Sequence, residues 1–81
     1  MRKTKKGNAK NVIGNRIRKI RLAAKPAISQ EDLSSRLAVR GITLDRSAIS
    51  RIENQERYLM DYEIVAIAKC LKVSVASLFG E

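Results

Sequence analysis

Apolar residues in this chain recur at helical spacing, and no stretch alternates between apolar and polar residues over the length of a strand. The clearest series is Ile13, Ile17, Ile20 and Ala24, spaced 4, 3 and 4 residues apart and ending just before the single proline. Residues at this spacing share one face of a helix, and proline cannot continue it. The pattern predicts a helix over residues 12–24.

Four further segments carry the same signals, and in each a Ser or Asp precedes the first helical residue. Such a side chain can accept a hydrogen bond from a free backbone amide of the first turn. Five short helices packed as one all-α domain are therefore expected. The predicted segments are 30–40 behind Ser29, 46–53 behind Asp45, 62–72 behind Asp61 and 75–79 behind Ser74.

The chain divides into a basic arm and one domain. Residues 1–10 contain almost no apolar side chain and are predicted to be flexible, whereas residues 11–81 form the domain. The longest uninterrupted apolar run, IVAIA, is too short to cross a bilayer, so a cytoplasmic protein without membrane contact is expected.

Catalysis is not expected. Histidine is absent, the single cysteine cannot form an internal disulfide, and the carboxylates are scattered rather than paired. No metal, cofactor or small-molecule ligand is predicted. Cys70 lies in an apolar helical segment and is interpreted as a core residue.

Positive charge is concentrated at one end of the sequence. The formal net charge is +9; residues 1–25 hold ten Lys and Arg with no acid, whereas residues 26–81 hold seven against eight acids. This polarity is typical of a protein that binds a polyanion, with nucleic acid first and an anionic membrane surface second. A solubilising tail is the alternative.

One side of the predicted helix over 46–53 is unusually rich in hydrogen-bonding groups. Ala48, Ile49 and Ile52 occupy the apolar side, so the helix can bury one face and expose the other. A solvated helix face is the alternative interpretation. At roughly 100° per residue, the polar arc consists of Arg46, Ser50, Asn54, Ser47 and Arg51.

The order ISQEDL, SAISRIEN and LKVSVASLF resembles the phage-repressor and Cro-like helix-turn-helix family, also called the XRE family, over residues 11–79. The resemblance implies a compact five-helix lambda-repressor-like domain in which segments 30–40 and 46–53 form the helix-turn-helix. The second of these helices would enter the major groove, and two copies would bind successive half-sites.

The resemblance also implies roles for individual residues. Glu53 matches a glutamate that pairs with an arginine of the first helix, here Arg21. In this family the residue after Glu-Asn is usually glycine, so Asn54 or Gln55 is expected at positive φ, which asparagine tolerates better. By this resemblance, base reading is expected of Arg46, Ser47 and Arg51, and contact with the DNA backbone of Gln30, Asn54 and Arg57. Base reading is also expected of Ser50, which shares the polar arc, and backbone contact of Lys10, because the cations of the arm have no core to serve.

These observations together predict a sequence-specific regulator of transcription that binds double-stranded DNA. It is expected to act as a repressor and as a homodimer, in the cytoplasm, associated with a prokaryotic or phage nucleoid. One alternative is an antitoxin-type DNA-binding regulator with a protein partner. Another is a protein-interaction adaptor that keeps the fold without reading bases.

Overall fold

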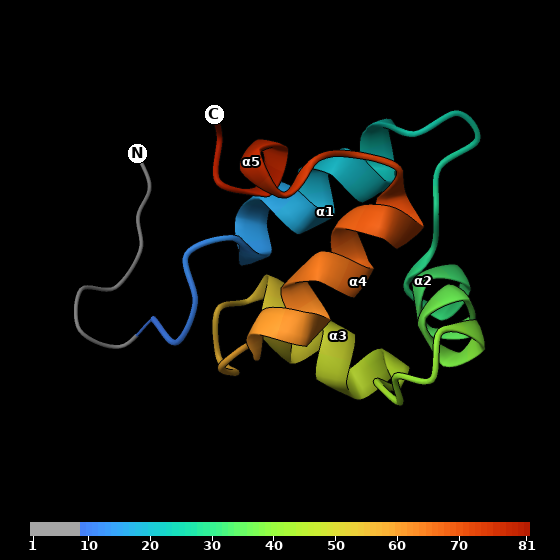
Figure 1. Ribbon diagram of the computed structural model, residues 1–81, viewed down its shortest axis with the longest axis horizontal. Coiled ribbons are helices and arrows are strands. Elements are labelled where there is room, and N and C mark those ends of the chain that lie inside the picture. The colour runs from blue at the N-terminus through green and yellow to red at the C-terminus, as the bar shows by residue number, and fades with distance from the viewer. Residues whose placement is uncertain (1–8) are drawn as a thin grey trace.

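A computed structural model of the protein describes residues 9–81, so the predicted arm falls almost entirely outside the described residues. Within residues 9–81 the chain forms five α-helices and no strand, packed into one domain, which confirms the predicted all-α class (Figure 1). The helices are α1 (Gly14–Ala23), α2 (Gln30–Val39), α3 (Arg46–Glu53), α4 (Asp61–Leu71) and α5 (Val75–Leu78).

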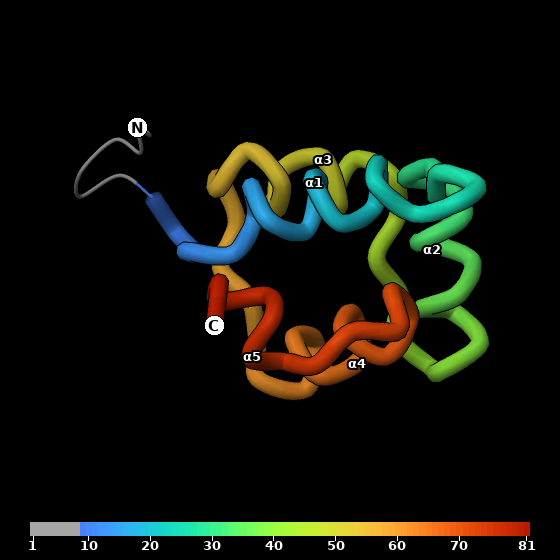
Figure 2. The backbone as a smooth tube through the Cα atoms, turned by 90° about the horizontal axis from the view of Figure 1, so that it is seen from above, coloured from blue at the N-terminus to red at the C-terminus, as the bar shows by residue number. Residues whose placement is uncertain are grey.

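The helices form two layers joined along one edge. Figure 2 shows α1 and α3 together on one side, α4 and α5 on the other, and α2 closing the edge between them. Accordingly, α3 packs against α1 and α2, α2 also packs against α4, and α4 carries α5. Helix α3 thus has one side against the domain and the other open to solvent.

The core lies between these layers and uses the apolar faces that the helical spacing predicted. Cys70 is buried within it, so its interpretation as a core residue is confirmed. The fully buried large side chains come from every helix and from the turn before α1: Ile13, Ile17, Leu33, Leu37, Ile49, Ile52, Ile67 and Leu78.

Three of the predicted N-caps are confirmed. The side chains of Ser29, Asp45 and Ser74 each accept a hydrogen bond from the backbone amide three residues later, at 2.9, 2.8 and 3.0 Å respectively. Because these bonds satisfy amides that have no partner within the helix, they fix where α2, α3 and α5 begin.

The predicted cap at Asp61 is wrong, because Asp61 is the first residue of α4 and Met60 occupies the cap position. The amide of Met60 donates to the Glu63 carboxylate at 2.9 Å, so an acid inside the first turn closes this end of the helix.

The predicted start of α1 at residue 12 is also wrong. The Asn11 side-chain oxygen accepts hydrogen bonds from the amides of Ile13 and Gly14 at 3.2 and 2.8 Å, so a turn precedes the helix. At the other end, α1, α2, α4 and α5 each stop one residue earlier than predicted, because the residue expected to be last serves as the C-cap.

The first turn of α1 lies directly against the end of α3. Gly14 is buried, and a Cβ atom added to it would collide with the backbone carbonyl oxygen of Ile52 and crowd that of Glu53. The Asn11 amide donates to the same Ile52 oxygen at 3.1 Å. Only glycine allows this approach of the two backbones.

We predict that Gly14→Ala separates α1 from α3 and destabilises the domain by roughly 1–3 kcal/mol, the usual cost of overpacking a close contact. Thermal or urea unfolding measures the loss. Asn15→Ala, at the neighbouring exposed position, is the matched control and should melt with the parent. A Gly14→Ala protein as stable as the control would contradict the close contact.

Candidate nucleic-acid interface

Helix α3 separates its side chains into a buried face and an exposed polar arc. Ile49, Ile52 and Glu53 are buried, at 1%, 1% and 3% exposure. The arc that the sequence predicted is on the outside, and no acid lies within it. Of the four expected base-reading residues, Arg46, Ser47 and Arg51 are exposed and Ser50 is half-buried.

The guanidinium of Arg46 has one weak partner. Its Nε lies 3.5 Å from Oε2 of Glu31 on α2, and both side chains are about two-thirds exposed, at 69% and 66%. Such an exposed pair is worth little in water and exchanges readily for another anion. Arg46 therefore remains available to a ligand that approaches α3.

A buried ion pair holds α3 in place, as the sequence predicted. Arg21 of α1 donates from Nε and Nη2 to the two oxygens of Glu53, at 2.7 and 2.9 Å, and its Nη1 donates to the Ile28 carbonyl at 2.9 Å. Both side chains are almost completely buried. The paired geometry satisfies two charges that could not otherwise be removed from water.

Gln30 connects this pair to the beginning of α2. Its side-chain amide donates to Glu53 Oε1 at 3.2 Å, so the carboxylate accepts from residues of two other helices. Beside it lies an open hollow of about 430 Å³ whose lining includes Gln30, Glu31 and Arg46. The start of α2 and the start of α3 thus face a common space, which is where a phosphate contact at Gln30 was expected.

The segment after α3 contains the positive φ that was expected at Asn54 or Gln55, and it falls on Gln55 rather than on the asparagine. Asn54 keeps an ordinary backbone conformation and is exposed, while Gln55 takes the positive φ of 63°. The amide of Gln55 donates to the Ile52 carbonyl, and its side chain donates to the Asn11 carbonyl at 3.0 Å. These bonds offset the strain of the positive φ at Gln55. The greater tolerance of asparagine for positive φ therefore does not determine which of the two residues adopts it.

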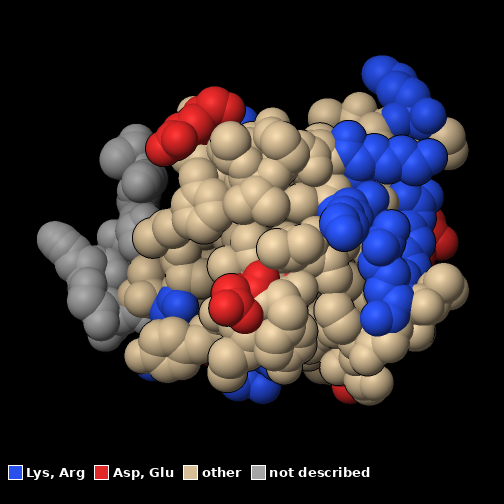
Figure 3. All heavy atoms as spheres, in the orientation of Figure 1, with Lys and Arg blue, Asp and Glu red and all other residues tan. Residues whose placement is uncertain are grey.

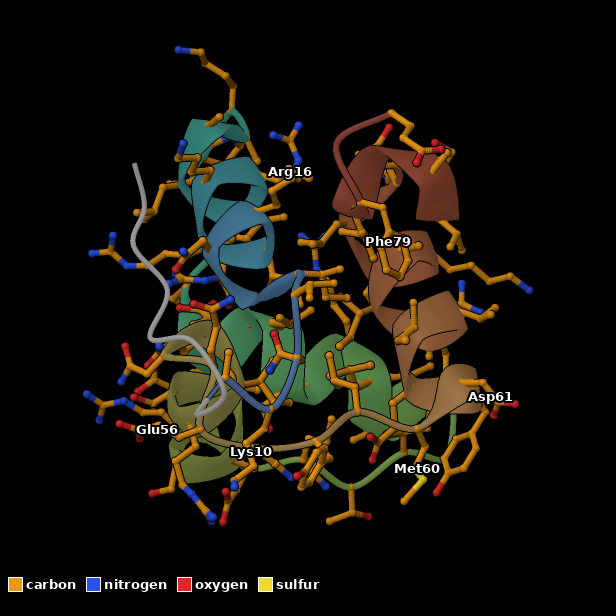
Figure 4. All side chains as sticks on the ribbon, turned by 90° about the vertical axis from the view of Figure 1, so that its left-hand side faces the viewer. Lys10, Arg16, Glu56, Met60, Asp61 and Phe79 are labelled. Atoms are coloured by element: carbon orange, nitrogen blue, oxygen red, sulfur yellow. The ribbon has the colours of Figure 1, made fainter. Side chains whose placement is uncertain are left out.

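Lys10 belongs to the domain rather than to a free arm. Its amide donates to the Gln55 carbonyl at 2.9 Å, and its ammonium lies 5.1 Å from the centre of the exposed Tyr58 ring. Figure 4 shows Lys10 close to the segment that follows α3. Of the predicted backbone contacts, Lys10 and Asn54 therefore lie near the end of α3. The Gln30 side chain also reaches that end through its hydrogen bond to Glu53, and the hollow beside Gln30 extends to Arg46 at the start of α3.

Arg57 has a structural partner that the sequence reasoning missed. Its guanidinium donates to both oxygens of Glu63, at 3.1 and 3.3 Å, and also to the Tyr58 carbonyl. Burial alone would raise the pKa of Glu63, but the hydrogen bonds from Arg57 and Met60, with the Arg57 charge, hold this pKa below its ordinary value. The phosphate contact expected of Arg57 stays a prediction and would compete with this ion pair.

The sequence did contain a signal for Glu63, because an acid three residues after a helix cap is typical of a capping box. A second missed residue is Ser34, whose hydroxyl donates to the Leu44 carbonyl at 2.7 Å and so ties α2 to the segment that leads into α3. Within residues 9–81 no group of three or more His, Cys, Asp or Glu could hold a metal ion, and no helix there is long and apolar enough to span a bilayer.

Comparison with known proteins finds no family model, no curated protein and no solved structure that matches this chain. No relative therefore supports the candidate interface, which rests on the contacts within this chain alone. The resemblance to the XRE family stays a prediction. What the fold defines is a compact all-α domain of five helices with an exposed, acid-free polar arc on α3.

We predict that Glu53→Ala destabilises the domain by about 3–5 kcal/mol, because Arg21 is left buried without its anion. That is a large part of the stability of so small a domain. Urea unfolding measures the effect, with Glu56→Ala as the exposed control. Replacing both partners, Arg21→Leu with Glu53→Leu, should cost less than the sum of the single changes. Additive losses would show that the two side chains act independently.

The depressed pKa of Glu63 predicts a pH effect on stability. A carboxylate whose pKa is lower in the folded state contributes stability above the unfolded-state pKa of about 4.3, and this contribution disappears as the pH falls through the folded value. Glu63→Gln should therefore be less stable than the parent at pH 6, and the two should converge as the pH falls below about 4. Urea midpoints across this range test it, with Glu56→Gln as the control. A gap that stays constant with pH would be incompatible with the ion pair.

Proposed function

We propose that this protein is a helix-turn-helix regulator of transcription that reads double-stranded DNA with α3. The observation that carries the proposal is the exposed arc of α3, which offers two guanidinium groups and several hydroxyl and amide groups with no acid among them. A helix face that only contacts water can carry acidic side chains. A surface that contacts phosphates and base edges cannot, because the acids would repel the phosphates.

In the proposed mechanism α3 lies in the major groove. Arg46 and Arg51 each have two donors that match O6 and N7 of guanine. The Ser47 hydroxyl both donates and accepts, so it can pair with either kind of base group at shorter reach. The paired contact gives sequence preference, because another base pair at that position offers a different set of donors and acceptors.

Phosphate contacts on both sides of α3 would fix its position in the groove. Gln30 at the start of α2 supplies one, helped by the positive end of the α2 dipole, and Lys10 with Asn54 supplies the other. The buried pair of Arg21 and Glu53 supports this arrangement, since it holds α3 relative to α1 and, through Gln30, relative to α2.

As a regulator the domain is proposed to act as a homodimer on two half-sites, and to repress by occupying its site. The runner-up proposal is an adaptor or antitoxin that binds another protein. An open hollow of about 230 Å³ favours it, because Val12, Leu59, Ile64 and Phe79 line this hollow and Val12 is 74% exposed. Recovery of an inverted repeat from a random pool of duplexes would support sequence-specific DNA binding, as a regulator or as an antitoxin-type regulator with a protein partner. No enrichment of any sequence would support the adaptor.

We predict that Arg51→Ala costs roughly 1–3 kcal/mol of affinity on the preferred duplex and little on a duplex already changed at the contacted guanine. The measurement is a double-mutant cycle between residue and base pair at fixed salt. Arg46→Ala is measured in the same way.

Lys10→Gln is the matched control for these variants. It removes one charge from a contact with phosphate, so it should weaken binding to every duplex alike and lower the salt slope by about one unit. If both arginine variants behaved like Lys10→Gln, α3 would be a backbone clamp, and base reading by α3 would be rejected.

A further inference from the structure

Five cations gather on a part of the surface that the proposed function does not use. Figure 3 shows Lys and Arg side chains crowded on one side of this face, over α2 and the end of α4. All five are exposed, and we call this surface the basic strip. It consists of Lys25 after α1, Arg36 and Arg40 at the end of α2, and Lys69 and Lys72 at the end of α4.

The basic strip is continuous. It runs through two adjoining hollows of about 370 and 320 Å³, and both are lined by Arg36 and Lys72. The first hollow also contains Arg40 and Lys69, and the second contains Lys25. A ligand with several anionic groups in a row could therefore contact cations along the whole length of the strip.

These charges are not used to stabilise the fold through ion pairs. Among residues 9–81, none of the five forms a salt bridge. Arg36 donates one hydrogen bond to the Cys70 carbonyl at 2.9 Å. Asp32 is the one acid that lines the two hollows, and its carboxylate already accepts from the Ser29 amide in the cap of α2.

The partial negative charges at the helix ends balance only part of the positive charge of the basic strip. Helices α1, α2 and α4 all end here, and each C-terminus carries about −0.5 of a charge. Adding roughly −1.5 from the three ends and −1 from Asp32 to the five cations leaves an excess of about +2 to +3. The excess shows that the surface suits an anionic ligand beyond what the helix ends require.

The basic strip and the polar arc of α3 belong to different sides of the molecule. Figure 2 shows α3 beside α1 and away from α4, and the buried face of α3 lies between its polar arc and the core. The strip instead involves the ends of α2 and α4. The hollow beside Gln30 shares Ala27 and Ile28 with the Lys25 end of the strip but no residue with the hollow that holds Arg40 and Lys69. We therefore expect a duplex held by α3 to leave the Arg40 and Lys69 end of the strip uncovered.

We propose that the basic strip binds the phosphate backbone of a second nucleic-acid duplex, so that one domain can bridge two duplexes. This inference rests on the proposed binding of a first duplex by α3. Long cations without an ion-pair partner suit phosphates of any sequence. An acidic protein fits less well, because Val39 is the only large exposed apolar side chain lining the two hollows, and stable protein interfaces need several such anchors.

The test is a sandwich assay. The protein is loaded on an immobilised duplex at low salt, washed, and offered a second, fluorescent duplex of unrelated sequence. The variant Arg40→Gln with Lys69→Gln removes two strip charges without disturbing the Arg36 hydrogen bond, and Arg18→Gln with Lys19→Gln removes two exposed charges from α1 as the matched control.

The parent and the control should retain the fluorescent duplex, whereas the strip variant should bind the immobilised duplex and retain much less of the second. The salt slope for retaining the second duplex should fall by about two units in the strip variant. Equal retention by strip variant and parent would overturn the proposal, since bridging would then come from two copies of α3. So would tighter binding of poly-glutamate than of duplex at the strip, which would indicate an acidic protein.

A separate comparison distinguishes failure of the strip from failure of base reading. Arg46→Gln with Arg51→Gln removes the charges of the α3 arc. That protein should still bind any duplex at about 50 mM salt through the strip, and should lose this binding when Arg40 and Lys69 are changed as well. If the combined change has no further effect, the strip does not bind nucleic acid, whatever α3 does.

Discussion

The carboxylate of Glu53 is the point on which the arrangement of the three amino-terminal helices depends. Glu53 is the last residue of α3. Its carboxylate accepts two hydrogen bonds from the Arg21 guanidinium of α1 and one from the Gln30 side-chain amide at the start of α2. Apolar packing alone would let short helices slide and rotate on one another. A buried, paired charge tolerates little displacement, because each lost hydrogen bond leaves a charge without water. The orientation of the exposed arc of α3 is therefore set from inside the domain.

Much of the fold could be predicted from the sequence, because its helices are short, strongly periodic and capped by polar side chains. The cap residue Asp45 and the spacing of Ile49 and Ile52 predicted the bounds of α3 that are observed. They also predicted that Arg46 and Arg51 are exposed. These features are local: they depend on residues within one or two turns of each other. The pair of Arg21 and Glu53 came from family resemblance, since periodicity places Glu53 only at the border of the apolar face.

Features that join distant segments could not be predicted in this way. Counting charges along the chain placed the positive excess at the amino-terminal end, yet Arg36, Arg40, Lys69 and Lys72 come together because α2 packs on α4. Gln55 takes the left-handed conformation because bonds to Asn11 and Ile52 hold it there, against the local preference for asparagine. The strip is brought together by packing between distant helices, and the conformation of Gln55 depends on the distant Asn11 as well as on a local bond to Ile52.

The hydrogen bond from the Lys10 amide to the Gln55 carbonyl has a mechanical consequence. Together with the hydrogen bonds of Asn11 to Ile52 and Gln55, it joins the chain entering α1 to the chain leaving α3, so a pull on the amino terminus reaches the end of α3 directly. The carboxyl terminus is tied elsewhere, through α5 and the hydrogen bond from Arg16 to the Ser77 carbonyl (Figure 4). A fused domain or surface anchor at the carboxyl end would load α1 and α5, whereas the same load at the amino end would act directly on α3.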